Sequence, residues 1–130
     1  MAKKAQEDRV FIQNAVRTLA TNIRFASVDN PVRSIAVTSS VPSEGKTTIA
    51  INLAQALASG GKSVLLMECD MRRRSLGNTL GVHARNGIYA VLSDQVALEE
   101  ATARTEIRNV WFLDGEPHIP NPVDILGSRR

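Results

Sequence analysis

The sequence predicts an α/β fold in which helices flank a parallel sheet. A short apolar run at 35–37 passes into a turn-rich loop and then into a helical pattern, and a second apolar run at 63–67 follows that helix. Strand, helix and strand in this order require a right-handed parallel crossover. We expect an N-terminal amphipathic helix over residues 1–30 and a partial α/β domain over residues 31–130 that contains this loop.

Composition narrows the class of protein. With 43% apolar and only 4% aromatic residues, the core must be built from Ala, Val, Leu and Ile, which suits helices on a parallel sheet. The net charge of +3 suits an anionic partner such as a nucleotide, but clustered basic residues with aromatic elements are absent, so no nucleic-acid surface is expected. The single Cys69, and the lack of a spanning run or signal peptide, predict a soluble cytoplasmic chain.

Residues 5–28 are predicted to form one amphipathic helix, which Asp29-Asn30-Pro31 ends. Its apolar positions recur every three or four residues: Ile12, Val16, Leu19 and Ile23. Such a stripe needs a surface to cover, either in its own domain or in a second copy of the chain.

The loop at 40–47 has the length and the Gly-Lys-Thr ending of a nucleotide-binding P-loop, with Ser in place of the usual first Gly. In such a loop, successive backbone N–H groups surround the phosphates, and the next helix directs its positive end toward them. The predicted nucleotide-binding residues are Ser40, Val41, Pro42, Ser43, Glu44, Gly45, Lys46, Thr47 and Thr48.

Three of these residues have individual roles. Gly45 lets the backbone approach the phosphates, Lys46 would neutralise the terminal phosphates, and the Thr47 hydroxyl would bind Mg²⁺, which prefers oxygen ligands. The expected cofactors are therefore ATP or ADP with Mg²⁺. The alternative is a plain turn with a solvated lysine, but the flanking strand and helix patterns, the latter ended by Gly60-Gly61, favour the P-loop.

Two acidic residues, Glu68 and Asp70, directly follow the second predicted strand. Because functional groups gather at the carboxyl ends of parallel strands, both would face the phosphate loop. Asp70 is then a candidate metal-site residue acting through a Mg²⁺-bound water, and Glu68 is a candidate base. The alternative is a polar strand end followed by a solvated basic turn at 72–74.

The rest of the chain is predicted to contain helical fragments over 75–104, including 88–92 and 96–103, and a third strand at 110–113. A turn at 114–117 follows that strand, and Asn121-Pro122 would begin another helix. His83 and His118 have no metal-ligand spacing with each other or with Cys69, so surface positions are expected for both.

Taken in order, these segments resemble the cytoplasmic kinase domain of the bacterial tyrosine kinases of capsule and exopolysaccharide synthesis, P-loop proteins related to the MinD and ParA ATPases. The resemblance covers roughly residues 10–128 and rests on TLATNIRFAS, SSVPSEGKTTIAINLAQALASGGKSVLLMECDMRR, GIYAVLSD and NPVDILGS. It implies a P-loop NTPase-like fold that binds ATP with Mg²⁺, autophosphorylation of a Tyr-rich tail, and a membrane-spanning activator. The implied location is cytoplasmic, at the inner face of the plasma membrane through that partner.

The resemblance also assigns residues by position. Lys46 and Thr47 match the phosphate-binding and metal-binding P-loop positions, and Glu68-Cys69-Asp70 matches an acidic motif that is normally Asp-x-Asp. Arg72 and Arg73 match the basic pair that follows this motif, and residues 121–126 match a segment that begins Asn-Pro.

Three departures from the family pattern modify the expectations. Glu68 replaces Asp, which affects catalysis more than binding. The positions that match the family's oligomerisation pattern, one acidic residue and two arginines, are Asn14, Arg17 and Ala20, so a ring built on that pattern is not expected. The sequence stops before the strand of the next metal-binding Asp and before the Tyr cluster, and Tyr89 is its only Tyr. We therefore expect a truncated domain that lacks the later strands and exposes a sheet edge.

Three functions remain open on the sequence. The first is the ATP-binding domain of a protein-tyrosine autokinase that regulates polysaccharide synthesis and export. The alternative is a non-catalytic module that binds nucleotide or a partner. A positioning ATPase of the MinD or ParA kind ranks lower, because those proteins carry an additional Lys early in the P-loop, where this sequence has Ser and Val.

Overall fold

A computed structural model of the chain describes residues 2–26, 28–38, 45–70, 75–116 and 127. The chain divides into two compact units, Met1–Lys62 and Ser63–Arg130, and each is described by itself. The boundary predicted at residue 30 between an N-terminal helix and a nucleotide-binding domain remains a prediction.

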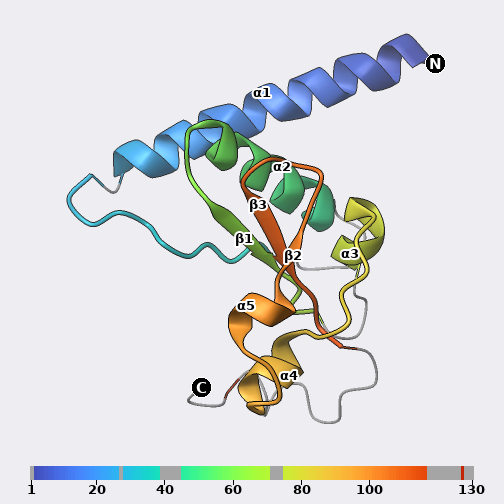
Figure 1. Cartoon of the computed structure of the whole chain (residues 1–130). Helices are drawn as coiled ribbons and strands as arrows, with labels where there is room; N and C mark the ends of the chain where they lie inside the picture. The colour runs from blue at the N-terminus through green and yellow to red at the C-terminus, as the bar shows by residue number, and fades with distance from the viewer. Residues whose placement is uncertain (1, 27, 39–44, 71–74, 117–126, 128–130) are drawn as a thin grey trace. The chain divides into compact units, whose positions relative to one another are not determined.

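The first unit contains two helices that lie alongside each other, α1 (Ala2–Ala26) and α2 (Lys46–Ser59) (Figure 1). Their contact is centred on the buried side chains of Val16, Ala20 and Leu53. Partly buried apolar residues surround this centre: Ile12, Ile23, Ala56 and Leu57. The predicted amphipathic helix is thus confirmed, and its apolar stripe packs on α2 of its own chain.

The predicted strand at 35–37 is not found. Residues 31–38 form neither helix nor strand, and the Ile35 side chain is 42% exposed. An apolar run becomes a strand only where a neighbouring strand satisfies its backbone N–H and C=O groups. None of the strands in the described ranges pairs with this segment.

The second unit is built on a small sheet of β1 (Val64–Met67), β2 (Ala103–Arg104) and β3 (Val110–Leu113), in the order β1-β3-β2. The β1 and β3 strands are parallel, with Leu66 opposite Phe112. The parallel crossover predicted between residues 35–37 and 63–67 is not found, because residues 35–37 do not form a strand. The β2 strand is antiparallel to β3, so the sheet is mixed. Residue 103 was predicted to end a helix, but it belongs to this strand.

Three short helices join the strands of the second unit: α3 (Ser75–Leu80), α4 (Ile88–Leu92) and α5 (Leu98–Ala101). Burial alternates from Leu65 to Leu66 and from Val110 to Phe112, because Leu66, Val110 and Phe112 are buried while Leu65 and Trp111 are exposed. Leu113, on the same face as Trp111, is buried and breaks this alternation. On the exposed side, the Arg104 guanidinium lies 5.3 Å from the centre of the Trp111 ring. A second buried cluster joins Ile88, Ala101 and Leu113.

Within the described ranges, no helix combines the length and the apolar character that crossing a bilayer requires.

Candidate nucleotide-binding site

The first candidate group lies where α2 begins. Gly45 precedes the helix in the left-handed conformation, with φ 78° and ψ 16°, and its C=O accepts the Ile49 N–H at 3.0 Å. A residue with a Cβ would adopt this conformation at a cost of roughly 1–2 kcal/mol. Among the described residues, no atom lies within 4 Å of where that Cβ would stand, so the backbone conformation is what favours glycine here.

The helix therefore starts at Lys46, as the P-loop interpretation predicts. Lys46 and Thr47 are half-buried in the first turn, whereas Thr48 is exposed and its C=O accepts a hydrogen bond from Asn52 Nδ2 at 2.9 Å. The amino end of a helix of 14 residues carries a partial positive charge that attracts anions. This end of α2 can therefore attract a phosphate group, with a lysine and a threonine hydroxyl in the same turn.

The remaining predicted P-loop residues, at 40–44, lie outside the described residues. The same holds for the matched basic pair Arg72 and Arg73, for the Asn-Pro segment at 121–126 and for His118. Their assignments stay predictions. His83 is exposed, as expected.

The second candidate group lies at the carboxyl ends of two parallel strands. Glu68 follows β1 and Asp114 follows β3, and the Glu68 N–H donates to the Leu113 C=O at 2.9 Å. Both acidic residues are buried, at 5% and 6% exposure, and Asp70 is half-buried. The strand-end rule that identified Glu68 and Asp70 applies equally to Asp114, which the sequence analysis assigned only to a turn.

The Glu68 carboxylate is held by backbone groups. Its Oε1 accepts a hydrogen bond from the Leu76 N–H of α3 at 3.1 Å, and the backbone of Asp70 also donates to it. Burial raises the pKa of Glu68, and the negative charges of Asp70 and Asp114 act in the same direction, while the backbone hydrogen bonds oppose them. The three carboxylates therefore interact electrostatically within one unit.

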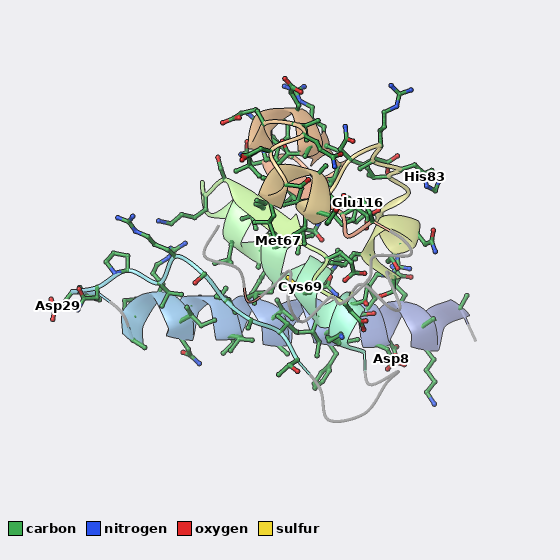
Figure 2. All side chains as sticks on the ribbon, turned by 90° about the horizontal axis from the view of Figure 1, so that it is seen from below. Asp8, Asp29, Met67, Cys69, His83 and Glu116 are labelled. Carbon is green, nitrogen blue, oxygen red and sulfur yellow. The ribbon has the colours of Figure 1, made fainter. Side chains whose placement is uncertain are left out.

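A further carboxylate, Glu116, supports the neighbouring helix and was not predicted from the sequence. It accepts hydrogen bonds from the first turn of α4, and its side chain is labelled in Figure 2. Asp114 accepts the Ile88 N–H through its C=O and the Gly115 N–H through Oδ1. Gly87 forms a parallel bridge to Asp114 and leaves no room for a side chain. These contacts fix the backbone around Asp114.

The side-chain oxygens of the predicted site are of the kind that bind Mg²⁺ together with the phosphates of a nucleotide. No group of three or more His, Cys, Asp or Glu side chains in the described part of the chain is arranged to hold a metal ion. Magnesium, however, usually takes one or two protein oxygens together with waters and substrate phosphates. The Thr47 hydroxyl of the first unit and the Asp70 carboxylate of the second are each oxygen donors of this kind.

The sequence matches one family model and is similar to tyrosine-protein kinases of bacteria. A family model described as an AAA domain matches residues 32–122. The tyrosine-protein kinase YwqD of Bacillus subtilis (strain 168) is 37% identical over 113 residues, which cover 87% of this chain and 48% of YwqD. The chain thus spans about half the length of this relative.

Solved structures agree with the sequence relatives. The BceF tyrosine kinase domain matches with a TM-score of 0.78 and 37% identity, over 91% of this chain and 47% of that one. The septum site-determining protein MinD of Pyrococcus horikoshii OT3, complexed with Mg-ADP, matches with a TM-score of 0.56 and 32% identity, over 68% and 36% of the two chains. These likenesses confirm the predicted P-loop NTPase-like α/β fold.

Proposed function

Because the chain belongs to the AAA domain family, whose model matches residues 32–122, we propose that it is the ATP-binding part of a bacterial protein-tyrosine autokinase. The kinase would regulate the synthesis and export of capsule or exopolysaccharide. YwqD and the BceF domain are named tyrosine kinases, and BceF matches with a higher TM-score and identity than MinD, which supports this choice over a positioning ATPase. The observation that carries the proposal is left-handed Gly45 directly before a helix that begins with Lys46 and Thr47.

The proposed reaction transfers the γ-phosphoryl group of ATP to a tyrosine hydroxyl. The bond between the γ-phosphorus and the oxygen that bridges it to the β-phosphate breaks and ADP leaves, while a bond to the tyrosine oxygen forms and the hydroxyl proton passes to the Asp70 carboxylate. Catalysis of this kind depends on positioning and charge stabilisation. The amides at the start of α2 and the Lys46 ammonium bind the phosphates. The Thr47 hydroxyl would bind Mg²⁺ and Asp70 would hold it through a bound water, and the ion would supply charge neutralisation.

Asp70 is the carboxylate proposed to prepare the attacking hydroxyl. Glu68, the other candidate that the sequence offers, also follows β1, and the charges of Asp70 and Asp114 act on it. A carboxylate prepares a nucleophile by accepting its hydrogen bond or its proton within hydrogen-bond reach.

We further propose that the chain acts in the cytoplasm, at the inner face of the plasma membrane, together with a membrane-spanning activator. Assembly into a ring through the helix pattern of the family is not part of this proposal. Of the three matched positions on α1, Asn14 and Arg17 are exposed, but Ala20 is 8% exposed and packs against α2. A residue buried against its own chain does not face a neighbouring copy.

Phosphate transfer from radiolabelled ATP tests the proposal. We expect the purified chain with Mg²⁺ to form phosphotyrosine on an added Tyr-rich peptide, and a Lys46→Met variant to lose this activity. ATP hydrolysis without phosphotyrosine would instead indicate a positioning ATPase. Nucleotide binding with neither reaction would indicate a non-catalytic module, and either result would overturn the kinase assignment.

A further inference from the structure

The contacts of Glu68 differ from those expected of a base that meets a substrate. The residue is 5% exposed, and its Oε1 accepts the Leu76 N–H at 3.1 Å. Its own N–H donates to the Leu113 C=O at 2.9 Å. Glu68 is therefore fixed by β3 through its backbone and by α3 through its side chain.

The contacts of Glu68 also involve Asp70. The bond from Glu68 to Leu76 joins the end of β1 to the first turn of α3 across eight positions of sequence, and Asp70 lies within that span. The backbone of Asp70 also donates to the same carboxylate. One carboxylate therefore binds the backbone of both Asp70 and Leu76. The position of Asp70 thus depends on the acceptor that Glu68 provides.

The length of the side chain matters for this contact. An aspartate at position 68 would withdraw the carboxylate by about 1.5 Å, the length of one carbon–carbon bond. From a donor–acceptor distance of 3.1 Å, a shift of that size leaves the range of a hydrogen bond unless the backbone moves. The longer glutamate therefore suits the span to Leu76.

We propose that Glu68 is a positioning residue, whose carboxylate holds the backbone of Asp70 and Leu76 as a hydrogen-bond acceptor and takes no proton from the substrate. The activity test of this role rests on the proposed kinase function, because the rate of tyrosine phosphorylation is what depends on the position of Asp70. The contact with α3 is a property of the folded chain and can be measured separately.

Two substitutions separate an acceptor from a base. Glu68→Gln keeps the side-chain length and one acceptor oxygen but cannot take a proton, whereas Glu68→Leu removes every acceptor. We expect kcat for phosphotyrosine formation to stay within about fivefold in Glu68→Gln, because the loss of a general base would cost about 10²–10⁴-fold. In Glu68→Leu we expect a loss of about a hundredfold, as for a misplaced catalytic group. Glu106→Gln, at an exposed position, is the matched control.

Hydrogen exchange of the Leu76 amide gives the second readout. It should remain slow in the wild type and in Glu68→Gln, and become faster in Glu68→Leu. A loss of activity of a hundredfold or more in Glu68→Gln with unchanged Leu76 exchange would overturn the proposal and identify a base. If the wild type forms no phosphotyrosine, the kinase proposal fails, but the exchange experiment still tests the positioning role of Glu68. Equal Leu76 exchange in all three proteins would overturn that role.

Discussion

The Oε2 atom of Glu116 accepts a hydrogen bond from the Ala90 N–H at 2.8 Å, across 26 positions of sequence. The other carboxylate oxygen accepts the Tyr89 N–H at 3.1 Å. The residue that precedes α4 is Gly87, which has no side chain with which to cap the helix. Glu116, which follows β3 in the sequence, therefore caps the start of α4, where the local sequence provides no capping side chain.

Removing this cap should destabilise the second unit. We expect Glu116→Ala to lower the free energy of unfolding by about 1 kcal/mol, the usual contribution of a helix cap, and Glu116→Gln to lose less because one acceptor oxygen remains. Urea unfolding measures the difference. Glu106→Ala, at an exposed position, is the control for loss of a negative charge. Equal stability of Glu116→Ala and this control would contradict the capping role.

Space at Gly87 should be limiting. Its φ of −148° is ordinary extended backbone, but an added Cβ would collide with the C=O of Asp114 and with Oε1 of Glu116. We expect Gly87→Ala to cost about 1–3 kcal/mol in thermal or urea unfolding, as overpacking does. At Gly60, by contrast, the nearest atom is the mobile end of the Arg24 side chain. Gly60→Ala should be much milder, and comparable losses would argue against the steric explanation.

The contact between α1 and α2 should depend on Leu53. This side chain is 5% exposed within the cluster that joins the two helices, whereas Ile49 on the same helix is 40% exposed. We expect Leu53→Ala to destabilise the fold by about 2–5 kcal/mol, because it leaves a cavity. Ile49→Ala should cost clearly less in the same unfolding experiment. If both substitutions cost the same, the packing of these helices is not as described.

Stability should fall with rising pH through the titration of Glu68. Its pKa is raised in the folded chain, chiefly by burial, with the charges of Asp70 and Asp114 adding to the effect. Between the ordinary glutamate pKa and this higher value, the folded state binds more protons than the unfolded state, so the free energy of unfolding decreases as pH rises. Glu68→Gln cannot ionise and should gain stability relative to the wild type across that window.

Unfolding of both proteins in urea from about pH 4 to about pH 8 measures this difference. The expected result is a stability difference that moves in favour of Glu68→Gln as pH rises. A difference that is constant with pH would mean that Glu68 titrates alike in the folded and unfolded chain.

The features predicted correctly from the sequence are those set by local patterns. The apolar stripe of α1 follows helical periodicity, and the strands β1 and β3 follow continuous apolar runs. The start of α2 at Lys46 follows the glycine that precedes it. Each of these signals lies within a few residues of the element it predicts.

The features that were missed depend on contacts between distant residues. The run at 35–37 has strand composition, but pairing requires a neighbour that no local pattern reveals. The two residues of β2 are too few to show alternation. Glu116 caps a helix that precedes it by 26 positions, which the turn-like sequence around it does not indicate. Asp114 could have been identified, since it follows a strand in the same way as Glu68.

The central claim is that the start of α2 binds the phosphates of a nucleotide and that Lys46 neutralises them. Calorimetric titration of Mg-ADP into the wild type and Lys46→Met tests it most directly, with Lys62→Met, an exposed lysine, as the control. A hydrogen bond to a charged group contributes about 1.5–3 kcal/mol, so the account predicts affinity at least about tenfold weaker in Lys46→Met and unchanged affinity in Lys62→Met. Equal affinity of the wild type and Lys46→Met would contradict it.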